Sequence, residues 1–413
     1  MLKLCAVLAF VAQASAFGAP KITLTVATFP DLDRAAKLAI PGFKKLYPDV
    51  DVRISALSAE DHHTAMITAL AGGSNLPDVM AIEARFIGQF AESAGLIDLR
   101  RAPYNAEARS TQLAKFALAA GKSSKGAMAA LPVDVGPGTM FYRADLLAKA
   151  QLKESDLTGS WEQFIDAGKK LKASTGAYLV ANAVDIKDIY IRASLADGEG
   201  IYFDANGKPV VTSPRFEKAF EIARAARQAG IDARIKAWTN EWSEGFRRDR
   251  VAAQMMGAWL GGHLQNWIAP QSKGAWRSAP LPNGMFASWG GSFYAIPEKG
   301  RHKEMAWAFL QYLVFDKAQQ IEAFRQLDAF PSLLEAQSDP FVDQPIEYFG
   351  GTAVRQQWSA AVRKIPAVDV DRYDEAAREI VDAQLEKVLD RGKDIKQALR
   401  DAERDILRRV RRY

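Results

Sequence analysis

The first hundred residues alternate between short apolar segments of strand type and longer helical segments, and this order restricts the fold more than any other feature. Segments 22–28, 50–57 and 78–82 have the composition of strands. Helical patterns occupy 33–47, where Pro41 is expected to kink or restart the helix, and 60–73, with another around 85–95. Strands that alternate with helices pair in parallel, with helices on both sheet faces. We therefore predict an α/β fold whose ligands bind beyond the carboxyl ends of the strands.

The remainder of the chain changes style twice. Residues 137–285 are more helical, and helices are predicted at 140–152, 160–174 and 213–230. After residue 285 a strand and a helix at 303–315 return to the style of the first part, and the last eighty residues read as helices. The chain is therefore expected to cross between two lobes more than once, so that the crossings form a hinge.

The N-terminus has the pattern of a secretory signal peptide. One positive charge, Lys3, precedes an apolar run at 4–12 that is too short to span a bilayer, and an A-x-A site ends at Ala16. We predict a signal peptide over 1–16; a buried N-terminal helix is the alternative. The only cysteine, Cys5, lies inside this segment, too early to be a lipid-attachment site. The mature chain would then lack disulfides and thiol chemistry, and it is expected to be a soluble periplasmic protein without a lipid anchor.

Charge and motif patterns exclude several function classes. The formal net charge is +5, and part of it lies in an arginine-rich C-terminal segment. Export argues against nucleic acid as a partner, and an amphipathic terminal helix explains the segment better. Its apolar residues recur at helical spacing: Ile395, Leu399, Ala402, Ile406 and Val410. The four histidines lack metal-binding spacing, and neither a P-loop, a dinucleotide motif nor a nucleophile elbow is present. We predict no metal and no cofactor.

Tryptophans concentrate in one region of the chain. Six of the nine lie between positions 238 and 289: Trp238, Trp242, Trp259, Trp267, Trp276 and Trp289. An indole suits the flat apolar face of a pyranose, and half-burying one contributes up to about 2.5 kcal/mol. Trp259 and Trp289 each neighbour glycines, and with Trp242 they are our candidates for ligand stacking. The alternative, that individual indoles belong to the core, stays open.

The stretch "SWGGSFYAIP" (288–297) places two glycines at the start of a strand. Glycine weakens a strand, so a pair of them indicates that something approaches the backbone closely. We expect a ligand to contact Gly290 and Gly291.

Two carboxylates lie near the ends of predicted strands. Glu83 closes the strand "DVMAIE", and Asp134 follows in "LPVDVGPGTMFYR". A carboxylate accepts two hydrogen bonds at once and so suits vicinal sugar hydroxyls; a helix cap or a surface acid is the alternative for each. Phe29 and Asp31, in the loop after the first strand, belong to the ligand cleft by the fold argument alone.

Four segments carry a resemblance to a known family. They are "GFKKLYPDVDVRI" (42–54), "ALAGGSNLPDVMAIEARFIGQFAESAGLIDL" (69–99), "LPVDVGPGTMFYRADLLAKA" (131–150) and "SWGGSFYAIPEKGRHKEMAWAFLQYL" (288–313). Together they resemble the family 1 extracellular solute-binding proteins, the maltose-binding-protein-like sugar receptors of carbohydrate ABC importers. The matches spread over most of the mature chain, although many members have Tyr-Asn where this chain has Tyr142-Arg143.

The resemblance implies a type II periplasmic-binding-protein fold, with a ligand cleft between two α/β lobes joined by a multi-strand hinge. The lobes would comprise 17–133 with 288–330, and 134–287 with 331–413. The implied function is a periplasmic receptor, not an enzyme, that binds a neutral di- or oligosaccharide and delivers it to an inner-membrane permease. We expect a monomer. The family's ligand positions fall on Glu83, Asp134, Trp259, Gly290, Gly291, Arg363 and His62.

Other functions remain open from the sequence. The same fold could bind a uronate, a polyol phosphate or a polyamine, and Arg85, Arg143 and Arg363 leave an acidic sugar possible. An exported glycoside hydrolase would need two carboxylates about 5–9.5 Å apart, for which Glu83 and Asp134 are the candidates.

Overall fold

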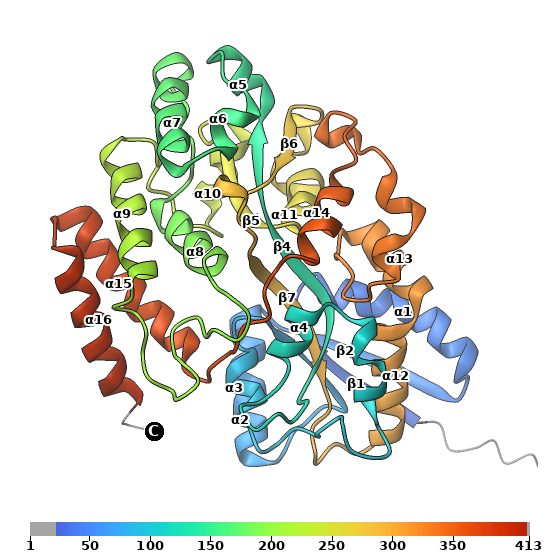
Figure 1. The fold of residues 1–413 in the computed structure, drawn as a ribbon. Coiled ribbons are helices and arrows are strands. Elements are labelled where there is room, and N and C mark those ends of the chain that lie inside the picture. The colour runs from blue at the N-terminus through green and yellow to red at the C-terminus, as the bar shows by residue number, and fades with distance from the viewer. Residues whose placement is uncertain (1–21, 411–413) are drawn as a thin grey trace, which may run out of the picture.

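The computed structural model describes residues 22–410, so the predicted signal peptide and Cys5 lie outside the described residues. Figure 1 shows two lobes, an N-terminal lobe below and a C-terminal lobe above, with two long strands running from one to the other. One seven-stranded sheet extends through both lobes in the order β2-β1-β3-β7-β4-β5, and β6 also pairs with β4.

The N-terminal lobe is built as the alternation predicts. Strands β1 (Ile22–Thr28), β2 (Val50–Ala56) and β3 (Val79–Glu83) are parallel. On β3, Val79 and Ala81 pack into a cluster with α1 and α12, whereas Met80 and Ile82 pack with α2 and α3, so helices cover both faces. The helix α1 continues through Pro41, so it does not restart there. The helices of this lobe are α1 (Leu32–Leu46), α2 (Ala59–Gly72), α3 (Ile87–Ala91), η1 (Ala106–Gln112), α4 (Lys115–Ala120), α12 (Lys303–Phe315) and α13 (Lys317–Leu327).

Two antiparallel strands, β4 (Leu131–Arg143) and β7 (Ser288–Ala295), join the lobes. The first part of β4 pairs with β7, and its far part pairs with β5 (Ala253–Gly257) and β6 (Trp276–Ala279). The helix predicted at 140–152 is therefore wrong at its start. Residues 140–143 complete the strand because two neighbouring strands pair with them, and only α5 (Ala144–Lys149) is helical.

The C-terminal lobe is largely helical. The helix α7 begins after the capping residue Ser160, and α9 begins with Pro214 at its first position, as predicted. The apolar face of α16 is buried as its spacing indicates. The helices of this lobe are α6 (Glu154–Thr158), α7 (Trp161–Thr175), α8 (Ala183–Ala193), α9 (Pro214–Gln228), α10 (Asn240–Arg247), α11 (Leu260–His263), η2 (Leu264–Ile268), η3 (Pro270–Ser272), η4 (Pro282–Gly284), η6 (Pro340–Asp343), η7 (Glu347–Phe349), α14 (Val354–Val362), α15 (Asp374–Arg391) and α16 (Ile395–Val410). The short helix η5 (Ala336–Ser338) packs instead on α13, and Ala336 lies in the buried cluster of the N-terminal lobe.

A third passage of the chain runs beside the two crossing strands. The N–H of Val135 donates to the Phe330 carbonyl at 2.9 Å, and Asp134 forms a bridge with Pro331. The lobes also touch away from these strands. The segment between α14 and α15 bonds to the C-terminal lobe through Asp369 and Glu199, and it passes α3 at Gly88. A Cβ on Gly88 would lie 2.3 Å from the Asp371 carbonyl oxygen, so only glycine permits this approach.

Among residues 22–410, no helix combines the length with the apolar character needed to cross a membrane.

Candidate functional site

A pocket of about 60 Å³ lies where β4 and β7 pass between the lobes. The N-terminal lobe contributes Ala84 and Ile87 to its wall, and the C-terminal lobe contributes Arg192 and Val370. Asp134, Gly290 and Gly291 of the crossing strands also line it. Both lobes therefore contact whatever the pocket holds.

Asp134 supplies the acidic group of this pocket. It pairs with Ser292 of β7, and the hydroxyl and backbone N–H of Ser292 both donate to its carboxylate. Burial raises the pKa of Asp134 to about 6; the nearby charge of Glu83 adds to this effect, and the bonds from Ser292 oppose it. The group is thus an acceptor held in place on the hinge.

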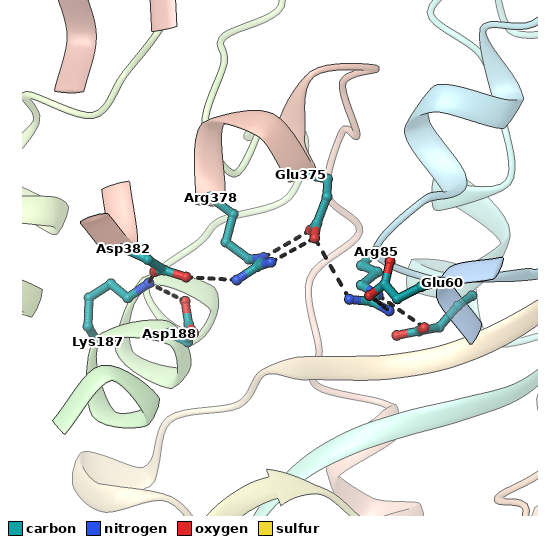
Figure 2. A network of polar contacts seen from close by, with 8 residues as sticks. Glu60, Arg85, Lys187, Asp188, Glu375, Arg378 and Asp382 are labelled. Carbon is teal, nitrogen blue, oxygen red and sulfur yellow. Dashed lines mark hydrogen bonds and ion pairs between the residues drawn. The ribbon is translucent and has the colours of Figure 1, made fainter. Parts of the chain in front are cut away.

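An ion network connects the two lobes beside the pocket (Figure 2). Arg85 of the N-terminal lobe contacts Glu60 at 2.7 Å, Glu83 at 3.1 Å and, across the cleft, Glu375 of α15 at 3.8 Å. Glu375 in turn contacts Arg378 at 2.7 Å. The pairs continue through Asp382 to Lys187 and Asp188 of α8.

Glu83 is fixed at two points. Its carboxylate accepts from Arg85, and its backbone N–H donates to Nε2 of His63 at 2.9 Å. Burial raises the pKa of Glu83, and the charge and hydrogen bond of Arg85 oppose that rise. Glu83 thus lies at the carboxyl end of β3, where the sequence places it, but already paired with a cation.

His62 is not a ligand-facing residue. Its side chain is buried, and its Nε2 bonds to the Ala81 carbonyl at 2.8 Å, which ties α2 to β3. Burial lowers its pKa, so the ring is neutral. Phe29 packs on His62 and His63, with ring centroids 5.7 and 5.5 Å away, and is itself buried. The predicted contact of His62 with ligand is therefore wrong, because the ring is buried and its Nε2 bonds to the strand backbone.

The indole of Trp259 packs against three glycines, Gly136, Gly257 and Gly290, which we call its glycine seat. Its Nε1 donates to the Trp289 carbonyl at 2.8 Å. If Gly257, Gly290 or Gly136 carried a Cβ, that atom would lie 2.2, 2.8 or 2.9 Å from this nitrogen, too close for any side chain. The structure thus gives the diglycine a second role. Gly290 and Gly291 line the pocket, where their contact with a ligand stays a prediction, and the indole of Trp259 also lies against Gly290.

A close contact with the backbone of β4 also explains why position 291 is a glycine. A Cβ there would lie 3.0 Å from the Asp134 carbonyl oxygen, and its φ of +114°, like the +80° of Gly290, strongly favours glycine. Trp289 is partly buried on β7, with the Arg192 guanidinium 5.7 Å from its ring centroid.

A row of aromatic rings continues outward from Trp259. Trp238 stacks on it with centroids 5.7 Å apart and an interplanar angle of 23°. His263 meets both rings at their edges, and Trp267 follows, donating from Nε1 to Nδ1 of His263 at 2.9 Å. We call Trp238, Trp259, His263 and Trp267 the aromatic row.

Trp242 belongs to the core and not to the cleft surface. Its side chain is fully buried, because it shares the inner face of α10 with Phe246, one turn later. Its selection as a ligand residue is thus corrected. Trp238, which the candidate residues omitted, is 55% exposed and lies on the row instead.

The remaining candidates divide between the cleft and the surface. Asp31, after β1, faces His263 of the other lobe at 3.8 Å. Arg363 is an exposed residue at the end of α14 and does not line the pocket. Arg143 is buried at the far end of β4 between Asp145 and Asp249, so it does not serve an acidic ligand.

The sequence reasoning named Arg85 only as a cation for an acidic sugar, although its position two residues after the end of β3 indicated that it lies at the cleft. Other cleft residues escaped it altogether. Glu375, Ser292 and Arg192 come from distant segments, and only the folded chain brings them to the cleft.

Comparison with known proteins agrees with this geometry. A family model described as bacterial extracellular solute-binding protein matches residues 27–320. A lactose-binding protein of Rhizobium radiobacter is 25% identical over 356 residues, which cover 81% of this chain and 80% of that protein.

Solved structures share the whole architecture. A crystal structure of an extracellular solute-binding protein of family 1 has a TM-score of 0.82 at 23% identity and covers 94% of this chain and 99% of its own. An ABC-transporter-associated binding protein of B. animalis subsp. lactis, in complex with β-1,6-galactobiose, has a TM-score of 0.75 at 20% identity and covers 93% and 96%. The predicted two-lobed α/β fold of the type II periplasmic binding proteins is confirmed.

Proposed function

This chain belongs to the bacterial extracellular solute-binding protein family, and from that premise we propose that it is the substrate-binding component of an ABC sugar importer. It binds a neutral di- or oligosaccharide between its lobes and delivers it to an inner-membrane permease. The lactose-binding relative and the neighbour in complex with β-1,6-galactobiose support a sugar as the solute.

One observation carries the proposal: both lobes and both crossing strands line a single pocket that holds a fixed carboxylate and adjoins an indole. Sugars need acceptors for their hydroxyls and a flat apolar surface for their C–H face. Asp134 offers the first, and Trp259, in contact with Gly290 of the pocket wall, offers the second.

The charges around the cleft favour a neutral solute over a uronate or a polyol phosphate. The network of Figure 2 includes Arg85, Arg378 and Lys187 but also the acids Glu60, Glu83, Glu375, Asp188 and Asp382. Because Arg85 already contacts three carboxylates, it has little to offer an anion. A polyamine is also disfavoured, since these acids are already paired with cations.

Binding requires the lobes to separate first. Pockets for small molecules measure about 300–1,000 Å³, several times the 60 Å³ found here. A bend in β4 and β7 would open the cleft, with the lobe boundaries near 133–134 and 287–288 and at 330–331. The solute then enters, and the lobes close on it.

The contacts of Glu83 and Asp134 are consistent with a receptor rather than with a hydrolase. Glu83 is bound to Arg85, and Asp134 accepts from Ser292, so both are held as hydrogen-bond acceptors. Incubating the protein with each glycoside that binds should release no product; turnover that Glu83→Gln abolishes would instead support the hydrolase.

The cellular setting follows from the family and the sequence pattern. We propose that residues 1–16 are removed as a signal peptide and that the protein acts in the periplasm as a monomer without a lipid anchor. Nucleic acid is not among its partners.

Calorimetric titration of the mature protein tests this function. The panel comprises lactose, β-1,6-galactobiose, maltose, sucrose, trehalose, arabino-oligosaccharides, a uronate, glycerol phosphate and a polyamine. We expect saturable binding of a neutral saccharide that Trp259→Ala and Asp134→Ala each weaken at least tenfold, about 1.4 kcal/mol. Binding of only the uronate, the phosphate or the polyamine would refute the sugar assignment.

A further inference from the structure

The aromatic row extends beyond the pocket to the protein surface, where two of its indoles are exposed. Trp238 is 55% exposed and Trp267 is 44% exposed, which makes them two of the few large apolar side chains that residues 22–410 leave open. His263 contacts both indoles, so they belong to one exposed apolar patch, and such patches mark binding surfaces.

The backbone holds Trp238 in an unusual conformation. Its φ is +68°, a strained region that bulky side chains rarely adopt. Trp242 packs against the same indole at 5.1 Å between centroids, so the ring is supported from the core. Since Trp259 covers one face of Trp238, the exposed area lies on the remaining surface of the indole.

Polar groups accompany these rings, as a sugar requires. Asp31 of the opposite lobe lies 3.8 Å from Nδ1 of His263, with its side chain 54% exposed. Burial lowers the pKa of His263, with Asp31 opposing this and Arg34 adding to it, so the imidazole is neutral. A carboxylate facing a row of rings suits a polyhydroxylated ring more than a purely apolar partner.

The row is continuous with the pocket. Gly290 lines the pocket and contacts the indole of Trp259, which stacks on Trp238. We propose that Trp238, with Asp31 opposite, forms an outer subsite for a further sugar unit of a saccharide whose first units occupy the pocket. Trp267 lies at the far end of this subsite. The inference rests on the proposed function and makes it more specific: the cargo is an oligosaccharide of at least three units.

Chain-length titrations test the outer subsite. Calorimetry would compare galacto-oligosaccharides and malto-oligosaccharides of two, three and four units with the wild-type protein and with Trp238→Ala. In the series that binds, a third unit should tighten the wild-type Kd about tenfold, the stacking gain after ordering costs. Trp238→Ala should remove that gain while the disaccharide binds as before, and Trp238→Phe should restore most of it.

One control variant and the dependence of Kd on chain length separate the outcomes. Leu46→Ala, on an exposed residue of α1, should leave every Kd unchanged. Equal weakening of all lengths by Trp238→Ala, or no gain with length in the wild type, would overturn the outer subsite while leaving the sugar receptor intact. If no saccharide in either panel binds, the proposed function itself fails, and the subsite fails with it.

Discussion

The chemistry of single residues in the cleft depends on how each is buried. Asp134 combines an acidic side chain with a position on the hinge, and its pKa is raised to about 6. A carboxyl whose pKa is higher in the folded state binds its proton more tightly there than in the unfolded chain. The free energy of unfolding therefore falls as the pH rises from about 4 to about 6.

Asp134→Asn should remove this loss of stability at high pH. At pH 7.5 the variant is expected to unfold at a higher temperature than the wild type without ligand, because it has no buried charge at this position. The difference should shrink as the pH falls through 6 and vanish below about 4, where the wild-type carboxyl is protonated in both states. Thermal unfolding across this pH range measures it; a difference that is independent of pH would contradict the raised pKa.

Gly257→Ala tests the seat of Trp259. The new Cβ would lie 2.2 Å from Nε1 of the indole and 2.3 Å from the Trp289 carbonyl oxygen, so one of them must move. We expect the free energy of unfolding to fall by about 1–3 kcal/mol in urea denaturation. Gly72→Ala is the control, because only Ser74 Oγ lies near, at 3.5 Å. Equal stability of Gly257→Ala and Gly72→Ala would show that the residues around Trp259 can accommodate an added Cβ at no cost.

Trp238 and Trp242 illustrate what could be predicted at this scale. The spacing of Trp242 and Phe246, after a capping Thr239, is that of a buried helix face, so the sequence held the signal that Trp242 is core. Nothing comparable marks Trp238, since its exposure depends on a loop whose backbone adopts a positive φ. The contact between Gly290 and Trp259 was also unpredictable, because Trp259 lies 31 positions earlier in the chain.

Among the elements, those with strong local patterns were predicted best. The predicted helix at 303–315 coincides with α12, and Gly73, at φ +62°, ends α2 as expected. The far part of β4 was misread because "MFYRADLLAKA" has helical propensity, whereas pairing with β5 and β6 decides its conformation. The last eighty residues include short 3-10 turns, such as Pro340–Asp343, that no periodicity indicates.

The helix α15 is attached to α8 by a buried cation. The side chain of Lys187 is fully buried between Asp188 and Asp382, and their charges raise its pKa against the effect of burial. Lys187→Met should leave Asp188 without this cation and Asp382 with Arg378 alone, and it should cost about 3–5 kcal/mol. Urea denaturation measures the loss. Lys218→Met, which removes an exposed pair with Glu162 at 3.6 Å, should cost less than about 1 kcal/mol. A similar loss of unfolding free energy in Lys187→Met and Lys218→Met would contradict a buried ion pair at Lys187.

For the whole molecule, the two-lobed fold was predictable because its signals are spread along the chain, whereas the closeness of the lobes was not. Contact between them depends on single residues such as Gly88, where backbone meets backbone. The sequence shows a glycine in a helix but not which segment lies against it.

Gly88→Ala should act as a wedge between the lobes. Its Cβ would lie 2.3 Å from the Asp371 carbonyl oxygen and 2.8 Å from the carbonyl carbon, so the closed arrangement becomes strained. We expect a larger radius of gyration in X-ray scattering and an at least tenfold weaker Kd for the bound saccharide, with little change in thermal stability. Gly176→Ala, on an exposed turn with no atom near its Cβ, should leave the radius and the affinity unchanged. An unchanged radius for Gly88→Ala would mean that α3 yields instead.

The crossing strands carry one more consequence, for the exchange of backbone amides with solvent. The pairing of β4 with β7 is irregular at two places, between Pro132 and Asp134 and between Val135 and Pro137. The two prolines have no N–H to donate, so the ladder already lacks bonds where it must bend. Opening would then break few hydrogen bonds. In deuterium exchange, the amides of β4 and β7 should stay slow with and without sugar, while those around Asp371 slow down only when sugar holds the lobes together.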